Sequence, residues 1–460
     1  MLQKITFYGF LTTILLAPLP FGSNREWSWT TLALLIGLWV FLDTLPFNQQ
    51  ENKEKSQLKK LLFPALLFSL FCGWSFLQTV SLSPTSSLPH PLWQEAQSIL
   101  NIQLPAAISL NPQDTLQSLM IMLTYGGCFW LSCRVCHAPE KAKIVLNAFM
   151  VASALYAFYG LIVYFLDLKT ILWFDKWAYK QDVTSTFVNR NTYATYAALG
   201  TLVSIAVLFQ SIGKHLHDHL TPRQTIRILI ENISQKAWFP FTAFLLNITA
   251  LFQTHSRGGF LSLIIAMALL LACLAYIRLI PRKLLISFFA VVGFGAVFAL
   301  SMSSDLTLKR LEGTSLASSA RDDVYLATTE AIKSAPYIGT GYGTFQEGFK
   351  PFKSDSEMLS WYDWTEAHNT YLELAMETGI PATLLMISLF LLLFYINMRA
   401  VMKRRRRQIY AVVSAAAIVL VAAHAVVDFS LQIPGFTVSF LLIAGMGWAQ
   451  SWTSKRRRKA

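Results

Sequence analysis

The residues best suited to proton transfer stand close together in the last third of the chain. His368 directly precedes an expected helix start, where Thr370 and Glu373 have the S/T-x-x-E spacing of a capping box. Glu366, Glu373 and Glu377 recur at helical spacing and would share one polar face. A long uncharged stretch follows. The pattern therefore places a titratable histidine at the mouth of a membrane span. The alternative is a loop histidine beside a solvated helix face.

Three arginines could bind an anion near the outer ends of expected spans. Arg257 lies in the hairpin Thr-His-Ser-Arg-Gly-Gly, where the glycines would allow a bulky anionic headgroup to approach. The alternative is an arginine that caps a helix end and extends its charged group to the membrane surface. Arg321 is in the first turn of an expected helix, where the helix dipole favours an anion. Either the two following aspartates or a bound phosphate would compensate it. Arg190, between Asn189 and Asn191, could join this site, although asparagines at a span start are usually caps.

Other polar motifs favour structural roles. His424 and Asp428 are four residues apart near the outer end of an expected span, which predicts a structural His–Asp pair. The glycine-rich segment Gly339–Phe345 is interpreted first as a structural turn and only second as a ligand-binding loop. The reason is that no Lys-Ser/Thr follows it, as a phosphate-binding loop requires. The sequence shows no Walker loop, Rossmann fingerprint or metal-ligand cluster. We therefore expect no metal or cofactor, and both ATP-driven transport and cytosolic glycosyl transfer are disfavoured.

The composition indicates a membrane protein. Of the 460 residues, 54% are hydrophobic and only 14% are charged, whereas soluble proteins average about 25% charged residues. The formal net charge of +13 arises from short basic clusters between apolar runs. That placement follows the positive-inside rule and argues against nucleic acid as a partner.

The apolar runs predict an all-α, polytopic membrane protein with about twelve transmembrane helices of ~20 residues. The basic clusters all fall on one side, which places both termini in the cytoplasm. A large outer loop, residues 303–368, separates the ninth and tenth spans and leads into His368. The expected spans are residues 5–21, 27–45, 61–80, 115–133, 144–166, 192–211, 238–254, 259–277, 284–302, 380–398, 409–427 and 435–452.

The outer-facing motifs together resemble the bacterial O-antigen ligase and polymerase superfamily over roughly Thr186 to Arg399. The most specific element is His-Asn-Thr-Tyr-Leu-Glu at 368–373, followed by Gly-Ile-Pro at 379–381. The Ser-Arg-Gly-Gly element at 256–259 is the next most specific. Thr186–Asn191 and Arg321, ahead of the glycine-rich turn, complete the pattern.

The resemblance implies a metal-independent, inverting glycosyltransferase at the periplasmic face of a bacterial inner membrane. Its donor would be a glycan on undecaprenyl diphosphate. Its acceptor would be a sugar hydroxyl, on lipid A–core in ligases or on another lipid-linked glycan in polymerases. His368 would be the base, and Arg257 and Arg321 would hold the diphosphate. Further substrate contacts are expected from the following residues: Arg190, Asn189, Asn191, Asn369, Glu373 and Tyr342.

The resemblance also divides the chain into three parts. Residues 1–185 would hold the first five spans, residues 186–399 the catalytic region, and residues 400–460 the last two spans and a basic cytoplasmic tail. Within the superfamily a polymerase or a protein O-oligosaccharyltransferase remains an alternative to a ligase. A transporter for a lipid-linked glycan is an alternative from another class, and so is a non-catalytic scaffold. The two halves of the chain show no repeat of the kind transporters have.

Overall fold

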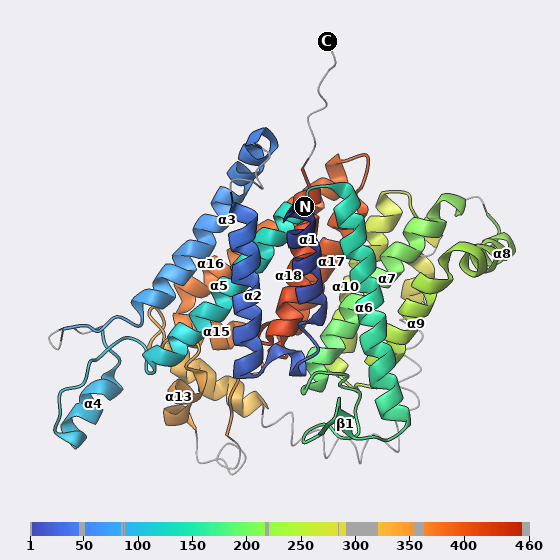
Figure 1. Cartoon of the computed structure of the whole chain (residues 1–460). Coiled ribbons are helices and arrows are strands. Elements are labelled where there is room, and N and C mark those ends of the chain that lie inside the picture. Colours follow the sequence, from blue (N-terminus) through green and yellow to red (C-terminus); the bar gives the residue numbers. More distant parts are fainter. Residues whose placement is uncertain are drawn as a thin grey trace.

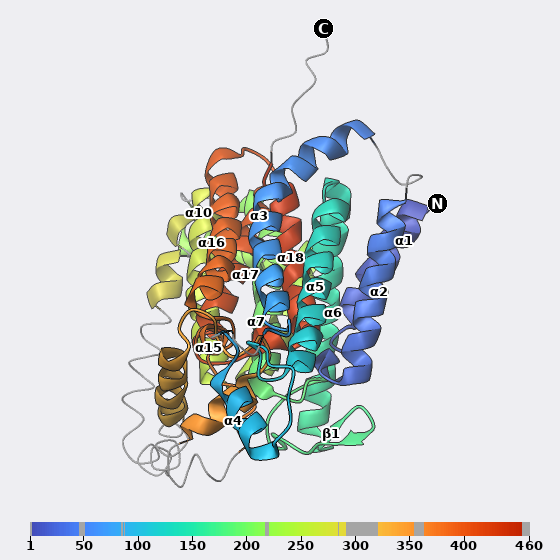
Figure 2. The same cartoon turned by 90° about the vertical axis from the view of Figure 1, so that its left-hand side faces the viewer.

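The chain folds into a bundle of long helices, seen in a computed structural model that describes residues 2–45, 51–83, 86, 88–216, 220–283, 285–290, 321–353 and 363–452. Figures 1 and 2 show these helices running side by side between two ends. The bundle helices are α1 (Leu2–Leu16), α2 (Glu26–Thr44), α3 (Glu51–Leu77), α5 (Pro112–Val135), α6 (Pro139–Phe165), α7 (Arg190–Ile212), α9 (Trp238–Phe252), α10 (Arg257–Tyr276), α16 (Ile380–Lys403), α17 (Ile409–His424) and α18 (Pro434–Gln450).

Short elements cover the two ends of the bundle. The start of α1 and the end of α18 lie at one end, and α4, α13, α15 and the two short strands lie at the other (Figure 1). The end that carries α15 is called the α15 end below. Its short elements are η1 (Phe21–Ser23), α4 (Pro91–Leu100), β1 (Thr170–Ile171) paired antiparallel with β2 (Phe174–Asp175), a helix over residues 321–334, α13 (Phe345–Phe349), η5 (Lys350–Phe352), α15 (Thr370–Thr378) and η6 (Ser430–Gln432). The other short elements are η3 (Gly213–His215), α8 (Pro222–Asn232), η4 (Ile233–Ala237) and a helix at residues 282–283 and 285–290.

Local sequence explains where many of the helices begin. Proline supplies the first residue of α4, α5, α6 and α18 and the second of α16, positions where its missing amide costs nothing. Polar side chains cap α7, α10 and α15 instead. These caps are Asn189, Ser256 and Asn369, and each accepts hydrogen bonds from amides of the first helical turn.

Seven of the described helices are long and apolar enough to cross a membrane, so the chain is a polytopic membrane protein. They are α2, α3 from Lys59, α5, α6, α7, α10 and α16. The expected count of about twelve is not reproduced, because α1, α9, α17 and α18 have only 15, 15, 16 and 17 residues. Of the expected ninth span, 284–302, only residues 285–290 are among those described, and they are helical.

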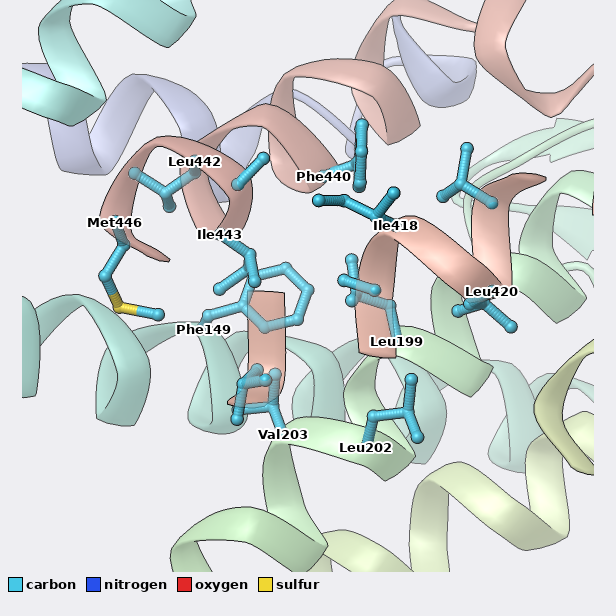
Figure 3. Close-up of a cluster of buried hydrophobic side chains, with 14 of the residues drawn as sticks. Phe149, Leu199, Leu202, Val203, Ile418, Leu420, Phe440, Leu442, Ile443 and Met446 are labelled. Carbon is cyan, nitrogen blue, oxygen red and sulfur yellow. The ribbon is translucent and has the colours of Figure 1, made fainter. Parts of the chain in front are cut away.

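The core lies where α6, α7, α17 and α18 meet. Figure 3 shows Phe149 of α6 and Leu199, Leu202 and Val203 of α7 facing apolar side chains of α17 and α18. A helix that is buried on every side is apolar all round rather than striped, and most of α7, α17 and α18 follows this rule. These three helices form the buried centre of the bundle, and the short elements of the α15 end are attached to it.

Two glycines of α18 allow its close packing. A Cβ atom at Gly445 would come within 2.5 Å of Ser132 of α5, and one at Gly447 would collide with Ser414 of α17. Small residues at such crossings let helix backbones approach each other, which is how helices associate in a membrane. The ends of α17 and α18 are thereby held in fixed positions.

Candidate active site

His368 is held at the start of α15 in an unusual backbone conformation. Its φ of 52° is left-handed, which is uncommon for a residue with a side chain. Asn369 caps the helix by accepting hydrogen bonds from the amides of Tyr371 and Leu372 at 3.0 and 3.2 Å. The expected capping box of Thr370 with Glu373 is therefore wrong, because the cap lies one residue earlier.

The imidazole of His368 faces a buried carboxylate. Its Nδ1 lies 3.4 Å from Oδ1 of Asp428, and the Asp428 side chain is 1% exposed. Oδ1 also accepts a hydrogen bond from the Phe429 amide at 2.9 Å, and the Phe429 ring lies 4.9 Å from the His368 ring. Burial acts to raise the pKa of Asp428, but contact with His368, electrostatic interaction with His424 and the Phe429 amide lower it overall.

Because its pKa is lowered, Asp428 is ionised at neutral pH. An ionised carboxylate beside Nδ1 favours the tautomer with its proton on that nitrogen. The lone pair is then on Nε2, which can accept a proton from a substrate. The same carboxylate stabilises the imidazolium ion after the transfer, as in other His–Asp pairs.

Glu373 holds the loop that carries His368. Its carboxylate accepts a hydrogen bond from the Ala367 amide at 2.8 Å and another from the Gln432 side chain. Glu373 is 4% exposed, and burial together with the charges of Glu377 and Glu366 raises its pKa well above the usual value. The expected polar helix face shared by three glutamates is therefore wrong, because Glu366 lies outside α15. Glu373 and Glu377 are buried, which also contradicts the alternative of a solvated face.

The glycine-rich turn packs against the same helix through Glu377. The Glu377 carboxylate accepts from the Phe345 amide at 3.0 Å, and its carbonyl oxygen accepts from the Gly341 amide at 2.8 Å. Gly339 has a φ of 70°, and a Cβ there would collide with the Glu377 carbonyl. The amides of this turn are therefore used in packing, in agreement with the interpretation as a structural turn.

Arg190 lies against Tyr179, and Arg321 is within electrostatic reach of it. The Arg190 guanidinium is 5.3 Å from the Tyr179 ring centre and pairs with Asp182 at 2.8 Å. Burial raises the pKa of Tyr179, the charge of Asp428 raises it further, and the charges of Arg190 and Arg321 act against the rise. Tyr179 is therefore within electrostatic reach of Asp428 and both arginines, which brings three distant parts of the chain together.

Arg321 is tied to the His368 loop through its own helix. One turn later, the Tyr325 hydroxyl donates a 3.0 Å hydrogen bond to the His368 carbonyl oxygen. Burial raises the pKa of Tyr325, and the Arg321 charge acts against that rise. The sequence also predicts Ser318 and Ser319 as caps of this helix, and both lie outside the described residues.

Arg257 is the first residue of α10, at the same end of the bundle. Ser256 caps the helix by accepting from the Gly259 amide at 3.3 Å. A Cβ at Gly258 would lie 2.8 Å from Val427 and 3.7 Å from Nε2 of His424. The start of α10 therefore packs against the segment between His424 and Asp428, and the exposed Arg257 adjoins this contact.

His424 and Asp428 use different side-chain partners. Nδ1 of His424 lies 3.0 Å from the Thr195 hydroxyl and 3.1 Å from the Ser430 hydroxyl. The Asp428 amide donates to the His424 carbonyl oxygen at 3.0 Å. In place of the expected side-chain pair, His424 ties α17 to α7 and Asp428 faces His368. The two remain close enough to interact electrostatically.

Asn189 and Tyr342, both expected as substrate contacts, lie in structural positions. Asn189 caps α7 by accepting from the Asn191 amide at 2.7 Å. The Asn191 carbonyl oxygen accepts from the Thr195 hydroxyl at 3.0 Å; these are backbone contacts, so the Asn191 side chain as a substrate contact stays a prediction. Tyr342 is packed edge-on against Phe71 of α3, 5.4 Å between ring centres, away from the described contacts of His368.

The structure adds residues that sequence reasoning did not select: Asp182, Tyr179, Tyr325 and Gln432. His255, which lies beside Arg257, also pairs with Asp182, at 2.8 Å. Their partners are distant in sequence, so no local spacing indicates these contacts. The signal that could have found Asp182 is its position in an outer segment rich in charged and aromatic residues. Among the described residues, no group of three His, Cys, Asp or Glu side chains is arranged to hold a metal ion.

Comparison with protein families matches residues 242–387 to the O-antigen ligase family. These residues are similar to an O-antigen ligase domain. The matched region contains Arg257, Arg321 and His368, whereas Arg190 and Asp428 lie outside it. The match confirms the resemblance to the O-antigen ligase and polymerase superfamily, and it supports a membrane glycosyltransferase of ligase or polymerase type. No curated protein matches the chain.

Proposed function

We propose that the chain transfers a glycan from undecaprenyl diphosphate to an acceptor sugar hydroxyl at the periplasmic face of a bacterial inner membrane. The observation that carries this proposal is the contact between His368 and the buried Asp428. Arg190 and Arg321 lie within electrostatic reach of the same region through Tyr179. Together these groups supply a base and a cationic site within one region, as the reaction needs. The similarity to an O-antigen ligase domain supports the same class of lipid-linked substrate.

In the proposed reaction, the acceptor oxygen attacks the anomeric carbon of the donor glycan. The bond from that carbon to the diphosphate oxygen breaks, and attack from the opposite side inverts the anomeric centre. Nε2 of His368 takes the acceptor proton, a contribution of about 10²–10⁴ in rate. The leaving diphosphate gains negative charge, which Arg257 and Arg321 stabilise, and arginine does this well because its planar fork binds phosphate oxygens in pairs.

Arg190 is the third proposed contact to the diphosphate. Its pairing with Asp182 fixes the direction of its guanidinium group, and its side chain is 35% exposed, so part of the fork is free to meet a ligand. Asn369 and Glu373 act one step away from the chemistry: the first starts α15, and the second holds the Ala367 amide next to the base. Both are proposed as positioning residues.

Purified protein in detergent tests the proposal directly. Wild-type protein given a lipid-linked glycan and an acceptor is expected to form a joined product with no gradient, which a pure transporter cannot do. His368→Ala should abolish the product, and Arg321→Lys should restore little of the activity lost in Arg321→Ala. His215→Ala, at the opposite end of α7, is the matched control. Normal transfer by His368→Ala would refute the assigned base.

The lipid-linked material that accumulates in a deletion strain separates the two reaction types. A ligase transfers finished polymer, so its loss leaves long polymer on undecaprenyl diphosphate. A polymerase joins repeat units, so its loss leaves single units on the lipid. The His368→Ala strain should accumulate the same material as the deletion strain.

A further inference from the structure

A polar cavity lies beside the candidate active site, between the end of α6 and the segment that leads to α7. Its volume is about 380 Å³. Residues 160–167 form one wall and residues 176–185 form most of the other. Three lysines and two aspartates line it: Lys169, Lys176, Lys180, Asp167 and Asp182.

The lysines leave an excess of positive charge in this cavity. Both aspartates are already paired: Asp167 with Lys169 at 3.1 Å, and Asp182 with Arg190 and His255 at 2.8 Å each. Lys176 is 5% exposed and donates a 2.5 Å hydrogen bond to the backbone oxygen of Asp182, not to its carboxylate. Lys176 and Lys180 therefore keep charge that a bound anion could neutralise.

Burial of Lys176 carries an energetic cost. It lowers the pKa of Lys176 to about 8, and the negative charge of Asp182 acts against that fall. An ammonium group with a single backbone acceptor is poorly compensated for leaving water, because it has three donors. A phosphate or carboxylate oxygen in the cavity would supply the missing acceptors.

The cavity opens near apolar surface. Phe165 belongs to its lining and is 66% exposed, and Trp173, on the neighbouring β1–β2 turn, is 80% exposed. Exposed aromatic side chains at the end of a span are typical of the bilayer interface. The cavity thus lies where a lipid headgroup and a membrane-bound glycan are both within reach.

We propose that this cavity is a second anion site, which binds a phosphate or carboxylate group through Lys176 and Lys180. It is separate from the arginine site, because Asp182 stands between them: its carboxylate faces Arg190 and its backbone oxygen faces Lys176. The anion could belong to an acidic glycan or to an anionic phospholipid. The inference does not require the proposed transfer reaction.

Binding measurements on the full chain test this site. The first probe set is inorganic phosphate and glucuronate, titrated by calorimetry into protein in neutral detergent. Arg257→Ala/Arg321→Ala serves as the background, so that phosphate at the arginine site does not contribute. In that background we expect Lys180→Met to weaken binding of at least one probe tenfold or more. The control Lys350→Met, at an exposed lysine of η5, should leave binding of both probes unchanged.

Lys176→Met should weaken binding as Lys180→Met does. Because Lys176 is buried, its substitution could prevent folding, and the result for the exposed Lys180 then decides the test.

The second probe is phosphatidylglycerol, counted on the protein by native mass spectrometry in the same detergent. One outcome is that the soluble anions bind tightly while Lys176→Met, Lys180→Met and the control Lys350→Met all retain the same number of lipids. That outcome assigns the site to a glycan. Loss of one retained lipid in Lys180→Met but not in Lys350→Met assigns it to a lipid headgroup. If folded Lys180→Met changes neither measurement, the anion site is overturned. No transfer activity enters this result, so it stands apart from a failure of the proposed function.

Discussion

Asp428 and His368 meet at 3.4 Å although they belong to different elements, one following α17 and the other preceding α15. Two backbone-directed contacts hold these elements together: the Thr370 amide donates to the Ala425 carbonyl oxygen at 2.9 Å, and its hydroxyl donates to the Asp428 carbonyl oxygen at 3.0 Å. The geometry of the base therefore depends on how α15 docks onto the end of α17.

Asp428→Asn should lower the rate of transfer by about 10²–10⁴-fold, because the neutral amide no longer fixes the His368 tautomer or stabilises the imidazolium ion. The measurement is a single-turnover transfer assay in detergent. Asp175→Asn, an exposed aspartate of β2, is the control and should behave as wild type. In the His368→Ala background the Asp428 change should have little further effect. Full additivity of the two changes would contradict a shared role.

Glu373→Ala should destabilise the folded protein by about 1–3 kcal/mol, because the buried Ala367 amide and Gln432 side chain both lose their acceptor. Transfer should also slow, since Ala367 adjoins His368. Denaturant unfolding in detergent measures the first effect. Glu330→Ala, on an exposed surface, should change stability by no more than about 0.5 kcal/mol. Equal stability of the two variants would rule out the positioning role of Glu373.

Substitutions of Asn189 can separate its role as a helix cap from a role in substrate binding. Asn189→Ala should cost about 0.5–2 kcal/mol of stability, and Asn189→Asp should restore most of it, because aspartate caps a helix equally well. If Asn189 acts only as a cap, Asn189→Asp also keeps normal transfer. Unchanged stability with lost transfer in Asn189→Asp would show instead that the amide contacts substrate. Thermal unfolding and the transfer assay are measured on the same samples.

Stability should fall as pH rises from about 5 to about 8, because of Glu377. Burial raises the pKa of Glu377 from its ordinary 4.5 to about 8, although the Gly343 and Phe345 amides act against the rise. Between these values the unfolded chain has released a proton that the folded chain keeps, so unfolding releases a proton and higher pH favours it. Glu373 acts in the same direction. Glu377→Gln should show a smaller fall in its thermal midpoint, and a fall equal to that of wild type would exclude this cause.

The helices were predictable because each long apolar run ends at a proline, a cap residue or a basic cluster. The number of spans was not, since α9 and α17 are apolar but have only 15 and 16 residues. Hydropathy windows extend past such helix ends into apolar turns. Thr254 illustrates this point. It falls within the expected span 238–254 but lies in the turn before α10, where its hydroxyl donates a hydrogen bond to the Leu251 carbonyl oxygen.

Residue types in the sequence indicate which side chains could act at the candidate site, but they indicate few of the contacts between them. His368, Arg257 and Arg321 stand out as titratable or charged groups in apolar surroundings, and the family resemblance gives them roles that stay predictions. Helical periodicity places Glu373 on a polar face, but it does not show whether that face meets a substrate, water or a buried amide. Sequence spacing pairs Asp428 with the histidine four residues away, because it reports neighbours on a helix and not a partner from another element.

The tight crossing of Gly447 with Ser414 divides the candidate site into two differently supported halves. It brings the backbones of α17 and α18 close together, and the Thr195–His424 contact links α17 to α7. Asp428 therefore follows a helix that is packed against two neighbours in the core. His368 belongs to the chain between α10 and α16 and reaches Asp428 through the contacts of Thr370. Changes in how α15 docks are thus expected to disturb the His368–Asp428 pair more than the packing of the core helices.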